Sequence, residues 1–195
     1  MGCAPMATRK TTEPAGRGHF QGSLGIDGLL FRDTEQQVTT PGAMVDVGAR
    51  YGIADDLDVG LRLYNLGVEG SAKWRFVRGG FAAAVSPAVS VARTNATQIT
   101  TKATYVFADL PLILGSRLTE SLTLDYGPKC VYGMYRPANG GAAHGFLLGA
   151  FVNLDVRMGR GFHFLPEIDV YGSVTGEVPV HGWIANGGLG LLKDF

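Results

Sequence analysis

Residues 45–51 read VDVGARY and residues 57–63 read LDVGLRL, and the five residues between the two runs read GIADD. Apolar and polar residues alternate strictly in both runs, so successive side chains point to opposite faces of an extended strand. An α-helix would instead spread Val45, Val47 and Ala49 around most of its circumference. Because the linker is short and contains two Asp residues, the stretch predicts a β-hairpin.

The same alternation continues along the chain and predicts about ten antiparallel strands. They run at about 20–31, 42–52, 57–65, 68–78, 80–92, 103–115, 121–133, 144–157, 162–173 and 181–192. The connections are alternately short and long, except for a short one near 66–67, and the long ones are rich in Gly, Thr, Asn and Pro. Short turns on one rim and longer loops on the other are typical of an up-and-down transmembrane β-barrel in the bacterial outer membrane, whose short turns face the periplasm. An even number of strands would bring both ends of the barrel to that periplasmic rim.

The composition excludes several classes of protein. The chain has 195 residues, which suits one domain, and its 17 basic residues balance its 17 acidic ones. A neutral chain with no basic tract is not expected to bind nucleic acid. Two Cys and four scattered His residues offer no metal-ligand spacing, so no metal and no cofactor is predicted. No apolar run reaches the ~18 residues that a membrane-spanning helix needs.

The N-terminal residues differ from the rest in composition. Residues 1–17 are polar, without hydrophobic periodicity, and predict a flexible tether ahead of a barrel domain at residues 18–195. The chain begins Met-Gly-Cys, so Cys3 is a candidate lipidation site, whose lipid would enter the inner leaflet from the periplasmic side. The alternatives are myristoylation of Gly2, which Met6 disfavours because that motif has Ser or Thr there, and an unmodified Cys.

One face of the predicted strands collects the charged side chains, and the other is apolar. The charged set is Asp46, Arg50, Asp58, Arg62, Glu69, Lys73, Arg75, Asp109, Asp125, Lys129, Asp155, Arg157, Glu167 and Asp169. Two closed structures fit this pattern. In a soluble barrel the apolar face points inward, and in a membrane barrel it meets lipid while the charges line the lumen.

Aromatic residues favour the membrane barrel. They lie on the apolar face near both ends of the strands, with smaller aliphatic residues between them. The set is Tyr51, Trp74, Phe76, Tyr132, Phe146, Phe162, Phe164 and Trp183. This distribution is typical of the two interfacial girdles of a membrane barrel, whereas a soluble core has no reason to sort its rings to the rims.

Two stretches resemble small bacterial outer-membrane β-barrel proteins. Residues 49–61, ARYGIADDLDVGL, are similar to a hairpin common in that group. The C-terminus, with Leu189, Leu191 and Phe195, resembles the signal by which the barrel-assembly machinery recognises its clients, although Lys193 stands where an apolar residue is usual. The resemblance implies a fold and a compartment, with outer-membrane lipid and the assembly machinery as partners, and no particular activity.

The predicted lumen has two interpretations. It is either a charged pathway for a small solute or a region closed by ion pairs, and the nearly balanced signs favour the closed form because buried charges need partners. The leading hypothesis is therefore a non-enzymatic barrel with a structural, anchoring or partner-binding role, other envelope proteins being candidate partners. The alternatives are a small-solute channel, an outer-membrane hydrolase or lipid-modifying enzyme that uses His144 or His181, and a soluble calycin-like ligand-binding barrel. No catalytic residue is predicted, and Cys130 is expected to act as a small hydrophobic side chain.

Overall fold

The structure is a computed structural model, and it describes residues 7–33, 37, 39–65, 67–94, 103–138, 140–176 and 182–195. Among these residues, none forms a helix of the length and apolar character that crossing a membrane requires.

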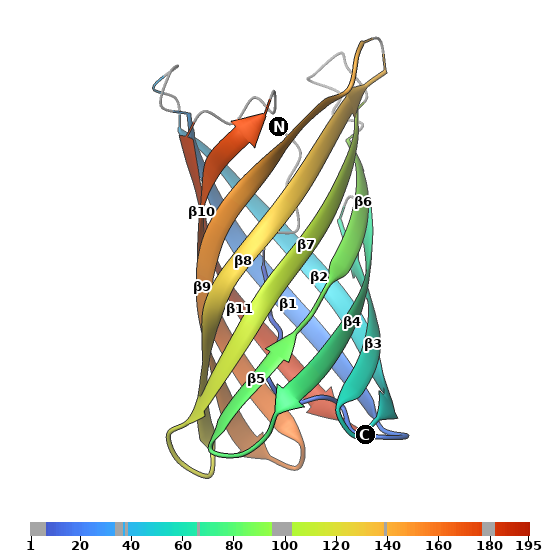
Figure 1. The fold of residues 1–195 in the computed structure, drawn as a ribbon, viewed down its shortest axis with the longest axis vertical. Helices are drawn as coiled ribbons and strands as arrows, with labels where there is room; N and C mark the ends of the chain where they lie inside the picture. The colour runs from blue at the N-terminus through green and yellow to red at the C-terminus, as the bar shows by residue number, and fades with distance from the viewer. Residues whose placement is uncertain are drawn as a thin grey trace.

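The described chain forms one closed, antiparallel β-barrel (Figure 1). Its strands are β1 (Phe20–Asp33), β2 (Thr39–Ala54), β3 (Leu57–Tyr64), β4 (Gly67–Val77), β5 (Phe81–Val85), β6 (Ala88–Thr94), β7 (Ala103–Arg117), β8 (Leu122–Pro137), β9 (Ala143–Gly159), β10 (Phe162–Gly176) and β11 (Gly182–Asp194). Consecutive strands pair with each other, except that β5 and β6 each pair with β4 and β7, and β1 pairs with β11 to close the wall. Since β5 and β6 together occupy one position in the wall, the predicted ten-strand barrel is confirmed.

The interruption between β5 and β6 is a difference from the sequence prediction. It lies at Ser86 and Pro87, and proline has no N–H to donate to a neighbouring strand. The wall stays closed because the remaining groups pair locally. The Ser86 amide donates to the Pro111 carbonyl (3.2 Å), the Ser86 hydroxyl donates to the Ala72 carbonyl (3.0 Å), and the Ala72 amide donates to the Pro87 carbonyl (3.0 Å).

The hairpin predicted around residues 45–63 is confirmed as β2 and β3. Val47 faces Leu63 and Tyr51 faces Val59 across the pair, so like residues share a face. A register shift between Gly52 and Ala54 leads into the turn at residues 55–56.

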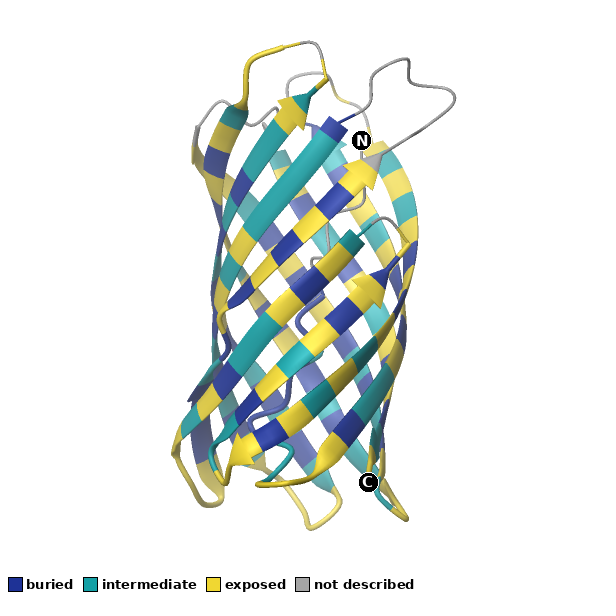
Figure 2. Ribbon diagram, turned by 90° about the vertical axis from the view of Figure 1, so that its right-hand side faces the viewer, coloured by how far each residue is buried: buried dark blue, intermediate teal, exposed yellow. Residues whose placement is uncertain are grey.

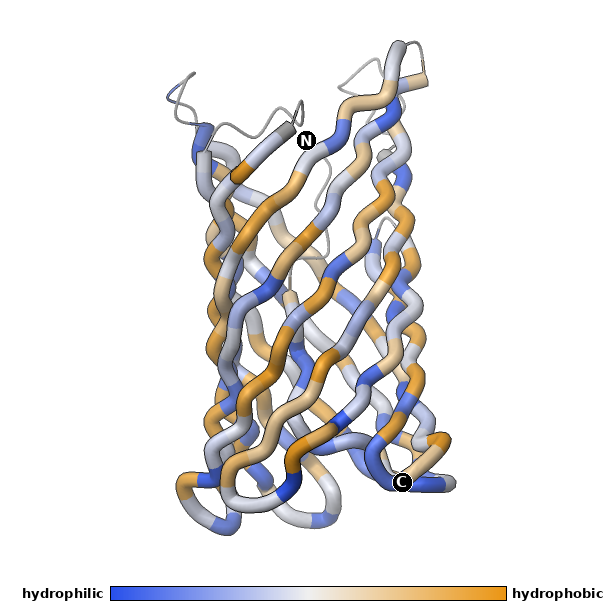
Figure 3. The backbone as a smooth tube through the Cα atoms, viewed as in Figure 1, coloured by the Kyte–Doolittle hydropathy of each residue, from blue (hydrophilic) through white to orange (hydrophobic). Residues whose placement is uncertain are grey.

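The outer face of the barrel is apolar. Exposed and buried residues alternate along the strands (Figure 2), and this alternation follows the hydropathy of the side chains (Figure 3). Val47, Leu61 and Leu148 are more than half exposed, at 53%, 55% and 53%, while Asp58 and Arg62 are buried. A soluble calycin-like barrel would show the reverse arrangement, because water would face the charges and the apolar side chains would fill the centre.

The inner face is charged over much of its length but becomes apolar towards the long-loop rim. Along β8, Val131 follows the buried Lys129, and along β10, Tyr171 follows the buried Asp169. One apolar cluster, on β1 and β8–β11, is formed by Phe31, Val131, Leu147, Tyr171 and Ile184. A second one, on β2, β3 and β6, is formed by Met44, Tyr64 and Ala92. These inward-facing apolar clusters are a difference from the charged inner face that the sequence predicts.

Residues 7–16, which we call the lumen segment, differ from the tether predicted for residues 1–17. The structure places them inside the barrel, where Figure 1 shows them as a dark blue trace running down to β1 at the short-turn rim. Thr8, Lys10 and Thr12 are buried. The physical reason is that the segment supplies donors and positive charge to acceptors on the wall. Cys3, the predicted lipidation site, lies outside the described residues.

Candidate functional site

The predicted charged residues line the inner face. Ten of the fourteen are buried, namely Asp46, Asp58, Arg62, Glu69, Lys73, Asp125, Lys129, Asp155, Glu167 and Asp169. The other four, which are partly buried, are Arg50, Arg75, Asp109 and Arg157. The strands position them by simple alternation, because every second residue points inward.

Most cations of the wall pair with carboxylates of the wall. The pairs are Arg50 and Lys73 with Asp58, Arg62 with Glu69, Lys129 with Asp109, and Arg75 with Asp56. Arg62 and Glu69 face each other directly across β3 and β4, and their charged groups lie 2.6 Å apart. Such pairing offsets the cost of removing both ions from water.

Arg9 of the lumen segment bridges two carboxylates of the wall. Its guanidinium forms ion pairs with Asp27 of β1 and with Asp46 of β2, the latter at 2.5 Å. The Arg9 amide also donates to Glu167 at 2.6 Å. Gly25 makes room for this contact, because a Cβ atom there would overlap the guanidinium. A basic side chain therefore holds the segment against β1 and β2.

Two threonines fix the segment through neutral donors. The Thr8 amide donates to Glu167 at 2.5 Å, and the Thr8 hydroxyl donates to Asp169 at 3.0 Å. The Thr12 amide and hydroxyl both donate to one oxygen of Asp125, at 3.1 and 2.9 Å. Hydrogen bonds to charged acceptors are stronger than neutral ones, so these contacts hold an otherwise irregular segment in one conformation.

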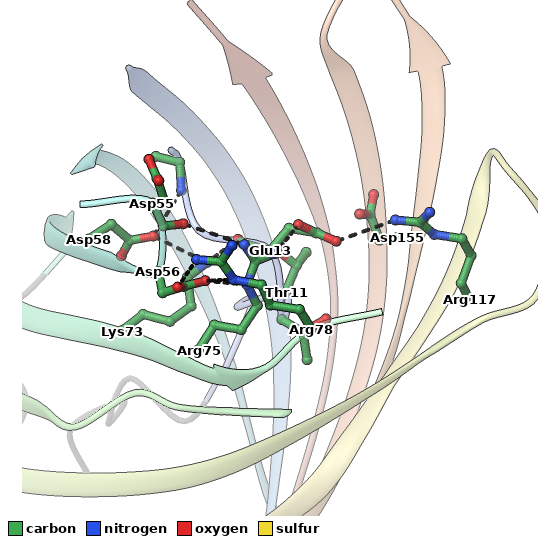
Figure 4. Close-up of polar contacts among 12 residues, drawn as sticks. Thr11, Glu13, Asp55, Asp56, Asp58, Lys73, Arg75, Arg78, Arg117 and Asp155 are labelled. Carbon is green, nitrogen blue, oxygen red and sulfur yellow. Dashed lines mark hydrogen bonds and ion pairs between the residues drawn. The ribbon is translucent and has the colours of Figure 1, made fainter. Parts of the chain in front are cut away.

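Glu13 binds the lumen segment to the wall near the short-turn rim (Figure 4). Its carboxylate pairs with Arg75 at 2.6 Å and with Arg117 at 3.5 Å, while its carbonyl accepts from Lys73 at 2.5 Å. Arg75 also pairs with Asp56 of the β2–β3 turn at 3.0 Å. The segment is thus bonded at this rim to β4 and β7, the two strands that flank β5.

His163 is a further buried polar residue of the inner face and is not among the predicted charged residues. Its two ring nitrogens lie 2.7 Å from Asp155 and 3.0 Å from Asp194. The signal was present in the sequence, because His163 shares its strand parity with Glu167. Across the described ranges, no three His, Cys, Asp or Glu side chains come together as a metal site.

The enzyme hypothesis gains no geometric support from the described residues. His144 is exposed on β9, and its ring lies 6.2 Å from that of Tyr132. His181 lies outside the described residues. Cys130 is a half-buried free thiol.

The predicted girdle residues lie on the outer face. Six of them are exposed, namely Tyr51, Trp74, Phe76, Phe146, Phe162 and Trp183. Tyr132 and Phe164 are half-buried, and Tyr132 packs against Phe146 with ring centroids 5.1 Å apart.

The C-terminal residues of the predicted assembly signal also face outward. Leu189, Leu191 and Phe195 are all exposed. The Phe195 amide donates to the Phe20 carbonyl at 2.8 Å, so the last residue lies at the short-turn rim beside the start of β1. Figure 1 shows the C-terminus at that rim.

The turn between β2 and β3 gives a prediction about pH. Hydrogen bonds from Arg78, and also from Arg75, hold the pKa of the Asp56 carboxyl below its usual value. This contribution to stability is present at neutral pH and is lost as the pH falls through the lowered pKa. We expect Arg78→Ala to raise the pKa of Asp56 towards its ordinary value, as measured by NMR titration of the carboxyl carbon. A pKa that does not move would contradict this role of Arg78.

Known proteins resemble this chain in structure, while its sequence has no match among family models or curated proteins. Neisserial surface protein A (NspA) superposes with a TM-score of 0.53 at 10% sequence identity, over 92% of this chain and 100% of that one. The fold is that of an outer-membrane β-barrel. Ail of Yersinia pestis (TM-score 0.48, 10% identity, 92% and 99% of the chains) and OprG of Pseudomonas aeruginosa (0.43, 10%, 94% and 99%) also match.

Proposed function

We propose that this chain is a bacterial outer-membrane protein with a closed lumen. Its role is structural, anchoring or partner-binding, and it acts neither as an enzyme nor, in this state, as an open channel. The observation that carries the proposal is the occupied lumen. Beside the lumen segment, a cavity of about 40 Å³ is left between Arg9, Lys10 and the wall of β1–β4. Such a space holds only a few water molecules.

The apolar outer face of the barrel supports a location in the outer membrane. A continuous apolar surface on a barrel is stable in lipid, and in water it would be a large unfavourable exposure. The exposed rings near both rims suit the two membrane interfaces. On this proposal the short turns and Phe195 face the periplasm, the long loops face outward, and outer-membrane lipid covers the strands.

The C-terminal strand and the two rims of the barrel are the surfaces that would contact protein partners. The outward-facing Leu189, Leu191 and Phe195 would present the assembly signal to the barrel-assembly machinery. The rims would offer surfaces to other envelope proteins. Lipidation of Cys3 stays a prediction, which mass spectrometry of the native protein would test.

The proposal is tested on the full chain. We expect extraction to require detergent, the folded protein to show heat-modifiable gel mobility, and conductance in planar lipid bilayers to stay at background, because the lumen is filled. Steady conductance of the unaltered protein would contradict the closed lumen. Monomeric behaviour without detergent would contradict the membrane location.

A further inference from the structure

We propose that residues 7–13 form a removable plug. When the plug leaves, the part of the lumen that it occupied becomes a passage selective for cations. This inference goes beyond the proposed function, which concerns the occupied state. It rests on which charges of the wall depend on the plug and which do not.

The buried cations of the wall that contact the plug do not depend on it, whereas Arg117, which pairs with Glu13, is 47% exposed at the short-turn rim. Arg62 donates to the Ala7 carbonyl, but it also pairs with Glu69 on β4. Lys73 donates to the Glu13 carbonyl, but it also pairs with Asp58 on β3. Withdrawal of the plug would leave each of these cations with a carboxylate partner.

Two carboxylates of the wall do depend on the plug. Within the described ranges, Asp27 and Asp46 have ion pairs with Arg9 and with no other cation. Both side chains are almost fully buried, at 2% and 1% exposure. Removal of Arg9 would therefore leave two buried carboxylates on β1 and β2 without a direct ion pair, with Arg62 as a more distant cation that acts on both.

Three further carboxylates would lose neutral donors. Asp125, Glu167 and Asp169 accept hydrogen bonds from the amides and hydroxyls of Thr8 and Thr12. After withdrawal these oxygens would face the water that replaces the plug. The vacated space would thus be lined by acidic groups in excess of basic ones.

An excess of one sign in a narrow, low-dielectric passage concentrates ions of the opposite sign. An extended chain occupies a cross-section of roughly 4.7 by 10 Å, so its departure leaves room for small, partly hydrated cations. Nearer the long-loop rim, two apolar clusters lie on different strands, and they approach each other where Tyr105, packed against one, stacks on Phe107, packed against the other, with ring centroids 6.2 Å apart. A cation would have to pass this apolar layer after leaving the acidic part of the lumen.

The test compares the full chain with a variant that lacks residues 7–13, in planar bilayers under a KCl gradient. We expect the full chain to be silent and the deletion variant to conduct, with K⁺ preferred over Cl⁻ by about tenfold. Adding Asp27→Asn and Asp46→Asn to the deletion should reduce this preference without abolishing conductance, since the charges rather than the bore are removed.

A synthetic peptide of residues 7–13 should block the deletion variant when added back. The same peptide with Arg9→Ala is the matched control and should block poorly, because it lacks the cation that bridges Asp27 and Asp46. If the deletion variant does not fold, Arg9→Glu in the full chain provides the same readout. It places a third carboxylate between the two on the wall and should expel the plug.

A folded variant that stays silent, or that conducts without preferring cations, would overturn the proposal. These outcomes are distinguishable from failure of the proposed function, which depends on the conductance and detergent requirement of the unaltered chain.

Discussion

Asp58→Asn is expected to lower the free energy of unfolding by about 3–5 kcal/mol. Asp58 is fully buried, and its two oxygens form ion pairs with Arg50 and Lys73, one with each. One oxygen also accepts the amide of Ala15 from the lumen segment at 3.1 Å. Asparagine keeps the shape but removes the charge, so the buried Lys73 and the partly buried Arg50 lose their carboxylate partner. Urea unfolding of the protein reconstituted in lipid vesicles measures the loss.

Asp56→Asn is the matched control for this prediction. Asp56 also accepts hydrogen bonds from two arginines, Arg75 and Arg78. It lies in the β2–β3 turn at the rim, where water screens the charges. We expect its effect to be clearly smaller. Asp58→Asn combined with Lys73→Met should recover part of the lost stability, because one unpaired cation is removed. Equal effects at positions 58 and 56 would show that burial of the pair is not what matters.

The fold could be predicted because each strand carries its own pattern. Alternation with a period of two tells which residues share a face, and it does so without knowledge of the partner strand. The split between β5 and β6 was not predicted, although Pro87 is visible in the sequence. Its effect depends on the groups opposite, Ala72 and Pro111, which lie far away in the chain.

The lumen segment could not be found by periodicity, because its order comes from contacts with distant strands. Thr8 binds Asp169, which is 161 residues away in the sequence. One signal was nevertheless available. The predicted inner set contains eight acidic and six basic residues, so it lacks two cations. Arg9 and Lys10 bring two positive charges from the segment that the composition marked as a tether, while Glu13 of that segment and Asp27 of β1 add two negative charges to the lumen.

The inward apolar residues escaped prediction for another reason. Tyr171 and Val131 lie on the same strand faces as Asp169 and Lys129, but their neighbours are apolar as well, so alternation is lost near the long-loop rim. A strand with apolar residues on both faces gives no indication of which face points inward.

Ile168→Arg is expected to destabilise the protein by about 2–4 kcal/mol in a lipid bilayer. Ile168 lies near the middle of β10, where it pairs with Val152 of β9 and Gly187 of β11. It is 59% exposed and contributes to the outer apolar face. An arginine there would have to place its charge in hydrocarbon or pull it towards an interface, and either adjustment has a cost. Urea unfolding in phospholipid vesicles measures the change.

Ile53→Arg separates the effect of lipid from that of exposure. Ile53 is 50% exposed, similar to Ile168, but it lies next to the β2–β3 turn at the short-turn rim. Near an interface the guanidinium reaches water and headgroups, so the expected loss is about 0–1 kcal/mol. Since residue type and exposure are matched, the difference between the two variants reports depth in the bilayer. Two equally small losses would mean that water, rather than hydrocarbon, surrounds the middle of β10.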